Sequence, residues 1–287
     1  MELKNNIRTE YLKNGFVVLK SIFSKEKISN LRNKMISLSN KDSEILLEEE
    51  IQSLLLNKEL IKNIKEVLDT NSLLYYSDSS IVNHKDPFKS TNGFHLDARG
   101  EDENIPYEKE YPIIRIGIYF EDYKNFSGGL KIKKKSHKYF CFNFRSKIFN
   151  LKRLIKILFT KTRYSLSSLK LGKSINLELL EGDVVIWNLR THHCGTSRRL
   201  KLFPKACIQP YFEKLLTENF YLPTQYKENR CSIFSTFSKN DLNNNNISGY
   251  INLKMDNDKL NQIKSNQNLF NKLNNLRIEL PKTLKVN

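Results

Sequence analysis

The N-terminal part of the chain carries apolar side chains at helical spacing. Ser24 is suited to cap a helix, and apolar residues follow it three or four positions apart, at Ile28, Leu31, Met35 and Leu38. A second stretch, from about residue 43 to 68, is rich in Leu, Ile, Glu and Lys. The pattern therefore predicts a helical N-terminal part over residues 1–70.

Short extended segments replace the helical pattern from residue 73 onward. Strands are predicted at residues 73–82, 111–120, 130–132, 184–187 and 205–212. Segment 111–120 alternates most clearly, because one face is wholly apolar while the other carries Arg115, Gly117 and Tyr119, which suits the lining of a site. Many short strands after a helical part predict a sandwich or barrel flanked by helices, with its core at residues 73–213.

Two segments differ in composition from the predicted core. Residues 139–175, called the basic insert below, lie between two strands and contain a weakly amphipathic helical pattern at 146–160. Residues 214–287 are rich in Asn and Lys, and we expect a loose extension there with one helix around residues 257–277. We find no internal repeat, and the length favours a single domain spanning residues 1–287.

Positive charge is concentrated in one part of the chain. There are 48 Lys and Arg residues against 31 Asp and Glu, which gives a formal charge of +17, yet residues 124–177 contain 15 basic residues and no acidic one. The rest of the chain is nearly neutral, so the charge is a local feature. We find no RNA- or DNA-binding motif and expect no specific nucleic-acid partner. A hydrophobic content of 39% excludes a wholly disordered polycation.

The sequence shows no sign of membrane insertion or export. No apolar run reaches the roughly 18 residues that a membrane span requires, and the first residues do not resemble a signal peptide. Four scattered cysteines contain no CxxC pair, which is typical of a reduced intracellular protein and disfavours a disulfide framework or a zinc site. We expect a cytoplasmic location.

A histidine and a carboxylate at His95-Leu-Asp97 are the first candidates for chemistry. Residues i and i+2 of a strand point to the same face, so both side chains can bind one metal ion. Further along the chain, a Gly-Asp turn and an apolar strand lead to the pair His192-His193. Two histidines and one carboxylate on facing strands form the facial triad of non-haem Fe(II) oxygenases. Neighbours on a strand point to opposite faces, so only one histidine of the pair can reach the metal.

Five sequence segments occur in a consistent order along roughly residues 15–212. They are GFVVL at 15–19, FHLD at 94–97, GIYFED at 117–122, GGLKIKKKSHK at 128–138 and, after Gly182-Asp183, HCG at 193–195. Together they resemble the phytanoyl-CoA dioxygenase family of Fe(II)/2-oxoglutarate-dependent oxygenases. In that family the second histidine ligand is typically followed by one residue and then Gly, which favours His193 over His192.

The resemblance implies a mainly β fold with flanking helices: a double-stranded β-helix (jelly roll, cupin-like) with a helical N-terminal part and a basic helical insert. It implies Fe(II) held by His95, Asp97 and His193, with 2-oxoglutarate and O2 as co-substrates. The expected reaction hydroxylates an unactivated C–H bond of a small, anionic, lipid- or sugar-linked substrate and releases succinate and CO2. Asp97 favours hydroxylation, because the related halogenases lack this carboxylate.

The chain departs from the family pattern where the 2-oxoglutarate-binding arginine is expected, shortly after the second histidine ligand. Lys205 stands there and can bind a carboxylate, but as a point charge and not as a guanidinium fork. Arg198 or Arg199 is the alternative anchor if the loop is shorter. Tyr119 and Arg115 are further co-substrate-binding candidates because alternation turns both inward, although Tyr119 can equally be a packed core residue.

The basic insert allows three interpretations: a solvated surface, an anion-binding wall over the active site, or a helix lying on an anionic membrane. In the second, Lys134, Lys135 and Arg190 bind an anionic substrate, although Arg190 can instead pair with a carboxylate. Lys134-Lys135 also replaces a proline of the family pattern. A catalytically inactive jelly-roll module that holds an anionic surface or polymer is the alternative to an oxygenase, and Lys205 is its main support.

Overall fold

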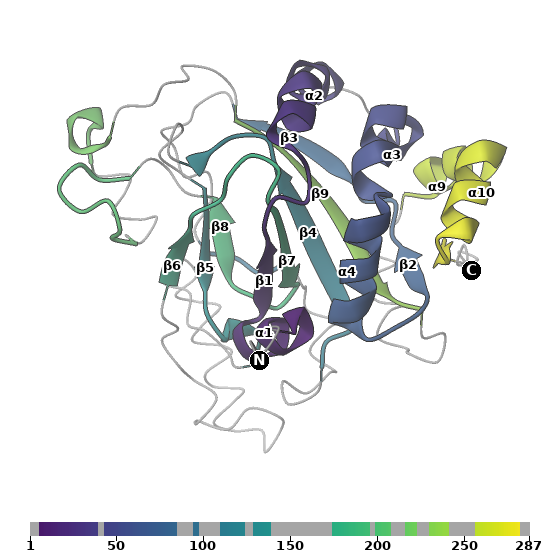
Figure 1. Ribbon diagram of the computed structural model, residues 1–287, viewed down its shortest axis with the longest axis horizontal. Coiled ribbons are helices and arrows are strands. Elements are labelled where there is room, and N and C mark those ends of the chain that lie inside the picture. Colours follow the sequence, from purple (N-terminus) through teal and green to yellow (C-terminus); the bar gives the residue numbers. More distant parts are fainter. Residues whose placement is uncertain are drawn as a thin grey trace.

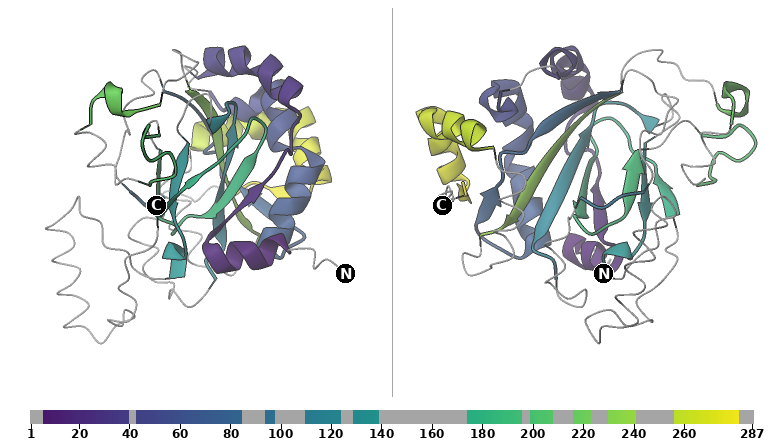
Figure 2. Two further views of the ribbon diagram at one scale, coloured as in Figure 1. Left: turned by 60° about the vertical axis from the view of Figure 1, so that its left-hand side comes forward. Right: turned by 180° about the vertical axis from the view of Figure 1, so that it is seen from behind.

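A computed structural model describes the chain at residues 6–39, 43–84, 94–97, 110–123, 129–138, 174–195, 199–207, 216–222, 230–240 and 256–281. Within these residues, two β-sheets pack face to face, and helices cover the outer face of the larger sheet (Figure 1). Figure 2 shows from behind that the helices and the smaller sheet lie on opposite sides of the larger one.

Seven of the described strands form the larger sheet. Its order is β1-β7-β4-β9-β2-β10, and β3 also pairs with β9. These strands are β1 (Phe16–Leu19), β2 (Leu73–Tyr75), β3 (Ser80–His84), β4 (Ile113–Tyr119), β7 (Val184–Asn188), β9 (Arg230–Lys239) and β10 (Ile278–Glu279). All of the pairings are antiparallel except that of β10 with β2.

The smaller sheet has the order β6-β5-β8. Its strands are β5 (Leu130–Lys133), β6 (Ser174–Leu177) and β8 (His193–Gly195). A two-residue bridge continues the ladder, because the backbones of His95 and His193 exchange two hydrogen bonds of 3.0 Å. The two sheets form the double-stranded β-helix, or jelly roll, that the family resemblance implies.

The helices lie mostly at the two ends of the chain. They are α1 (Ile7–Asn14), α2 (Lys25–Leu38), α3 (Glu49–Leu55), α4 (Lys58–Leu68), α9 (Asn257–Ser265) and α10 (Gln267–Asn275), with short 3-10 turns η1 (Ile45–Leu47), η3 (Ser136–Lys138) and η5 (Glu218–Phe220). The predicted start of a helix after Ser24 is confirmed, because the Ser24 hydroxyl accepts a hydrogen bond of 3.2 Å from the Lys27 N–H. The single helix predicted around residues 257–277 is two helices, divided where Asn266 caps α10.

The two faces of β4 enter different parts of the core, as predicted. Ile114, Ile116 and Ile118 pack into the large apolar cluster beneath the helices. Tyr119 belongs to a second cluster between the two sheets, together with Ile132 of β5 and others. One face of this strand therefore packs against the helical layer, and the other faces the interior of the jelly roll.

The prediction of helices over residues 1–70 is wrong at residues 16–19. These residues form β1, which pairs with β7 along its whole length. The apolar run Phe-Val-Val-Leu has no helical periodicity, and pairing with a buried strand satisfies its backbone. The stretch predicted as one strand at residues 73–82 is likewise two strands, β2 and β3, and both pair with β9.

The prediction of a loose extension beyond residue 213 is wrong for residues 230–239. They form β9, which lies between β4 and β2 in the larger sheet, so the jelly-roll core does not end at residue 213. The strand predicted at 205–212 is also not found where the structure describes it, because residues 205–207 are turn and coil.

The predicted helix at 146–160 and most of the basic insert at 139–175 lie outside the described residues. The described part begins again at Ser174, where β6 starts. Among the helices that the structure describes, none combines the length and the apolar character needed to cross a membrane.

Candidate metal centre

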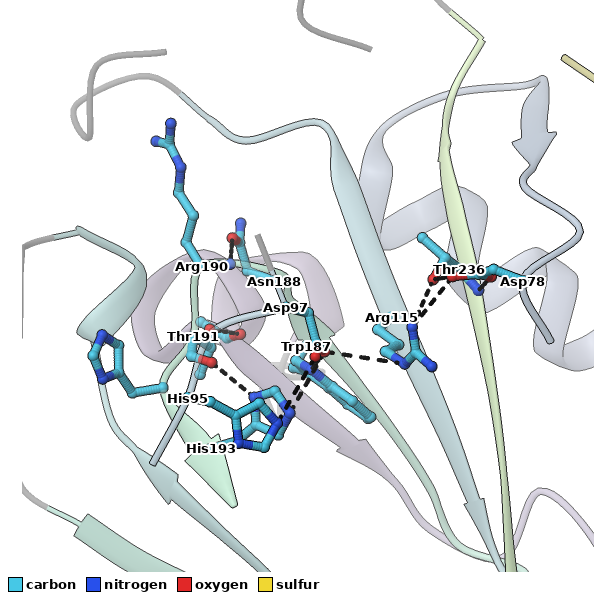
Figure 3. Close-up of polar contacts among 12 residues, drawn as sticks. Asp78, His95, Asp97, Arg115, Trp187, Asn188, Arg190, Thr191, His193 and Thr236 are labelled. Carbon is cyan, nitrogen blue, oxygen red and sulfur yellow. Dashed lines mark hydrogen bonds and ion pairs between the residues drawn. The ribbon is translucent and has the colours of Figure 1, made fainter. Parts of the chain in front are cut away.

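Three side chains converge where β8 meets the segment at residues 94–97. His95, Asp97 and His193 each offer one ligand atom, and these atoms all lie within 4.8 Å of one another. The Asp97 carboxylate faces both rings, with Oδ1 3.9 Å from His95 Nε2 and Oδ2 3.5 Å from His193 Nε2 (Figure 3). The spacing is that of a preformed binding site for one metal ion.

The backbone explains why these three residues meet. The His95–His193 bridge sets the two histidines side by side, with ring centroids 4.4 Å apart. The Asp97 N–H donates a hydrogen bond of 3.1 Å to the carbonyl of Leu189, which fixes the end of the short segment. The spacing of two residues then turns His95 and Asp97 to the same side, as the sequence predicts.

His193, and not its neighbour His192, joins the cluster. Ile132 lies opposite His193 in the register of β5 and β8, so both side chains face the interior of the jelly roll. His192 precedes the strand, and its N–H donates to the Ser136 hydroxyl at 2.9 Å. Alternation allowed only one of the two histidines to face the cluster, and the register of β5 and β8 shows that it is His193.

A carbonyl oxygen determines the form of the His193 ring. Nδ1 of His193 lies 2.9 Å from the carbonyl oxygen of Thr191, which can only accept a hydrogen bond, so Nδ1 carries the proton. Burial lowers the pKa of His193, while the neighbouring Asp97 opposes this effect. The ring is then neutral at pH 7, with the lone pair of Nε2 directed towards Asp97, as metal ligation requires.

The Asp97 carboxylate is held on its Oδ2 side. The indole N–H of Trp187 donates a hydrogen bond of 3.1 Å to Oδ2, and the Arg115 Nε lies 4.0 Å from the same atom. Burial alone would raise the pKa of Asp97, but His193, Arg115 and His95 outweigh it, so the pKa lies below its usual value. The carboxylate is ionised at neutral pH and available as a ligand.

The site is open on one side. The His95 side chain is 44% exposed, whereas that of His193 is 7% exposed. Two imidazoles and one carboxylate suit a divalent transition metal and leave coordination positions free on the open side. The residues present therefore fit a metal ion that also binds small ligands.

The other predicted co-substrate-binding residues lie in two different surroundings. Arg115 and Tyr119 lie on the face of β4 that is turned to the inside of the jelly roll. Arg115 is opposite Trp187 of β7 in the register, and Tyr119 belongs to the same apolar cluster as Trp187. Lys205 is exposed, and the Arg199 guanidinium stacks on the ring of Tyr123 at 4.8 Å.

The predicted anion-binding residues are on the loop after β7 and in the turn after β5. The Arg190 guanidinium stacks on the Tyr111 ring at 4.6 Å, and Figure 3 shows its side chain directed away from the three ligands. Lys134 is half-buried and Lys135 is exposed, both in the turn after β5. Their role in binding an anionic substrate remains a prediction.

Sequence reasoning missed Arg230, the first residue of β9. Register places Ser232 opposite Tyr119, and alternation turns Arg230, Ser232 and Tyr119 to the same face. A Cβ at Gly195 would lie 3.3 Å from Arg230 Nη2, so the guanidinium rests against β8 two residues beyond His193. Burial lowers the pKa of Arg230, whereas Tyr119 and Glu121 raise it. A cation therefore faces the interior close to the candidate metal centre.

Comparison with known proteins supports the fold. No protein-family model matches the sequence, and no curated protein matches it either. Among solved structures, HygX from Streptomyces hygroscopicus with nickel, 2-oxoglutarate and hygromycin B bound is 13% identical, with a TM-score of 0.52; the match covers 83% of this chain and 88% of that one. The non-heme alpha-ketoglutarate-dependent carbocyclase SnoK from nogalamycin biosynthesis is 12% identical, with a TM-score of 0.50, and the match covers 86% and 91%.

These similarities concern the fold. The chain shares the architecture of non-haem, 2-oxoglutarate-dependent enzymes, in line with the broader class that the sequence resembles. The narrower assignment to the phytanoyl-CoA dioxygenase family is not established, because no family model matches.

Proposed function

We propose that this protein is an Fe(II)- and 2-oxoglutarate-dependent oxygenase. The observation that carries the proposal is the convergence of His95, Asp97 and His193 within 4.8 Å, with Arg230 resting against the same strand as His193. The triad supplies the ligands of a non-haem iron centre, and the arginine supplies a second point of attachment for a co-substrate. HygX, which has the same fold, has been crystallised with 2-oxoglutarate bound.

The distance between the two attachment points suits a five-carbon dicarboxylate. Gly195 follows His193 by two residues on β8, which corresponds to about 7 Å along a strand. In the proposed complex, one end of 2-oxoglutarate binds the metal and the distal carboxylate pairs with the Arg230 fork. Arg230 therefore replaces Lys205 and Arg199 as the proposed anchor.

Tyr119 complements this anchor. Burial raises the pKa of its phenol, so the hydroxyl stays protonated at neutral pH and can donate a hydrogen bond to a carboxylate. Its ring packs edge-on against Phe234, and the Phe234 ring packs edge-on against Trp187, so three aromatic rings line this part of the interior. These rings exclude water from the space that we assign to the co-substrate.

The proposed reaction converts a C–H bond, O2 and 2-oxoglutarate into a hydroxylated product, succinate and CO2. Bound iron would supply the redox chemistry. The chain orients the three ligands through the Thr191 carbonyl and the Trp187 indole, and it binds the co-substrate at Arg230. We propose hydroxylation because Asp97 supplies a third protein ligand. We propose a small-molecule substrate, which would enter on the exposed side of His95.

The inactive binding module loses its main support. That alternative rested on Lys205 as a poor replacement for an arginine, and β9 carries a half-buried arginine at its first position. All three ligand positions also carry residues suited to bind a metal. We therefore retain the oxygenase as the proposed function.

Anaerobic protein with Fe(II) and 2-oxoglutarate should show a weak visible charge-transfer band, and admission of air should yield succinate. Both signals should disappear in His95→Ala and Asp97→Ala. His192→Gln is the matched control, because His192 lies beside a ligand but outside the cluster, and it should keep the band. Absence of both signals from the wild-type protein would refute the proposal.

A further inference from the structure

A buried polar clamp lies beside the metal centre, on the side of β9. Thr236 binds Asp78 twice: its N–H donates to Oδ1 at 3.1 Å, and its hydroxyl donates to Oδ2 at 2.6 Å. The Asp78 side chain is only 7% exposed. The two contacts fix both oxygens of a carboxylate that belongs to none of the metal-ligand positions.

This clamp holds Arg115. The Arg115 Nη1 donates to Asp78 Oδ2 at 3.2 Å and to the Thr236 hydroxyl at 3.3 Å, and the guanidinium lies over the Phe234 ring at 5.7 Å. The other edge of the guanidinium faces the metal centre, where Nε lies 4.0 Å from Asp97 Oδ2 (Figure 3). Arg115 is thus placed between two carboxylates and is bonded to the one that is not a candidate ligand.

Arg115 lies closer to Asp78, at 3.2 Å, than to Asp97, at 4.0 Å, and this difference matters for metal binding. A separation of 4.0 Å is too long for a hydrogen bond, so Arg115 attracts the Asp97 carboxylate without engaging it directly. An arginine freed from its clamp would form a paired, charge-assisted contact with the nearest carboxylate. A carboxylate engaged in that way competes poorly for a metal ion, because its oxygens are already occupied.

We propose that Asp78 and Thr236 restrain Arg115 so that it orients Asp97 but leaves this carboxylate free to bind the metal. Asp78 is then a positioning residue that acts through Arg115 and does not touch the metal. The inference rests on the proposed function, since it concerns the metal affinity of the same site. It also changes the role of Arg115, which was predicted to bind the co-substrate: its charge is already shared between Asp78 and Asp97.

The test measures the affinity of the full-length protein for Co(II) in the absence of 2-oxoglutarate. Asp78→Asn should bind cobalt about tenfold more weakly than the wild type, because Arg115 can then close on Asp97. The double variant Asp78→Asn/Arg115→Gln should regain most of this affinity, because it removes the competing cation. A residue with a merely structural role would not be rescued by loss of its partner.

Two further variants guard against misfolding and unspecific charge effects. Thr236→Val keeps the β-branched shape on β9 and removes the hydroxyl, so it should weaken cobalt binding in the same direction as Asp78→Asn. Glu110→Gln removes a negative charge that pairs with Arg8, and it should bind cobalt like the wild type. Thermal unfolding of each variant identifies any that fail to fold.

The outcomes separate this inference from the proposed function. If Asp78→Asn and Thr236→Val bind cobalt as tightly as the wild type, or if the double variant binds as weakly as Asp78→Asn, the restraint of Arg115 is refuted and the oxygenase proposal stands. If the wild-type protein binds neither cobalt nor iron, both ideas fail together.

Discussion

The indole N–H of Trp187 donates a hydrogen bond of 3.1 Å to Oδ2 of Asp97. The same indole packs against the His193 ring, with 5.2 Å between the ring centroids. One buried aromatic side chain therefore contacts two of the three candidate ligands. Because β7 carries Trp187 between β1 and β4, the larger sheet itself positions this contact.

Replacement of Trp187 by Phe should weaken metal binding. Phe keeps an aromatic ring in the core but cannot donate to Asp97, so we expect an affinity for Co(II) about tenfold lower. Ile186→Val is the control on the neighbouring residue of β7, which faces the helical layer. It should lower the free energy of unfolding by about 1 kcal/mol and leave cobalt affinity unchanged. Equal cobalt affinities in Trp187→Phe and the wild type would contradict the role of the indole.

Loss of Arg230 should impair binding of 2-oxoglutarate and not of the metal. A charged hydrogen bond contributes about 1.5–3 kcal/mol, so Arg230→Gln should raise the dissociation constant for 2-oxoglutarate roughly tenfold to a hundredfold. Titration of the iron-loaded protein, followed by the visible band, measures the effect. Lys205→Gln is the control and should bind like the wild type, because Lys205 is exposed. The opposite ranking of the two variants would restore Lys205 as the anchor.

Gly195 should tolerate no larger side chain without a loss of co-substrate affinity. A Cβ at this position lies 3.3 Å from Arg230 Nη2, which is tight enough to displace the guanidinium by a few tenths of an ångström. Gly195→Ala should therefore weaken 2-oxoglutarate binding, but less than Arg230→Gln does. Cys194→Ala changes the adjacent residue, whose side chain faces the other side of β8, and should have no such effect. A Gly195→Ala protein with unchanged affinity would place the co-substrate elsewhere.

The parts of the site that sequence reasoning predicted are those governed by local geometry. His95 and Asp97 are two residues apart, and strand alternation alone sets them on the same face. The two faces of β4 follow from the same rule. The helix cap at Ser24 follows from a different local property, the ability of its side-chain oxygen to accept a hydrogen bond from the first turn. Each of these features depends on neighbours within a few residues, so a single sequence contains the necessary information.

The parts that were missed depend on pairing between distant segments. Arg230 lies 37 residues after His193, so no fixed spacing could identify it. Its strand β9 alternates apolar residues with Ser232, Thr236 and Ser238, as a half-buried strand does, but the surrounding residues are rich in Asn and Lys, and this composition led to the prediction of a loose extension. Register with β4 turns these hydroxyl residues into the interior of the jelly roll, where Thr236 binds Asp78. A short strand such as β1 was missed for the same reason, since its pairing with β7 is not visible locally.

A buried carboxyl group should make the stability of the protein depend on pH. Glu121 is 6% exposed; its Oε1 accepts a hydrogen bond of 2.6 Å from the Cys231 N–H and lies 3.4 Å from the Arg32 Nε. Burial raises the pKa of Glu121 from 4.5 to about 7, although Cys231, Arg32 and Arg230 oppose this effect. Between these two values the folded protein binds a proton that the unfolded chain has released.

The sign of the effect follows from this difference. Protonation of Glu121 favours the folded state, so the stabilisation is complete below about pH 4.5 and is lost as the pH rises through about 7. The shift corresponds to roughly 3 kcal/mol. Glu121→Gln mimics the protonated group and should keep its stability where the wild-type protein loses it. From pH 5 to 8.5, urea unfolding should show the wild type losing roughly 2 to 3 kcal/mol relative to the variant, because a small part of the stabilisation is already lost at pH 5.

The comparison with a second carboxyl variant makes this test specific. His137 and other groups also titrate over part of the range, so only the difference between Glu121→Gln and the wild type isolates the Glu121 contribution. Glu178→Gln removes an exposed carboxylate and should follow the wild-type protein at every pH. If the wild type and Glu121→Gln instead run parallel from pH 5 to 8.5, the Arg32 contact compensates the buried charge fully. The carboxylate would then be ionised throughout, and the ion pair with Arg32 would hold α2 against the end of β4.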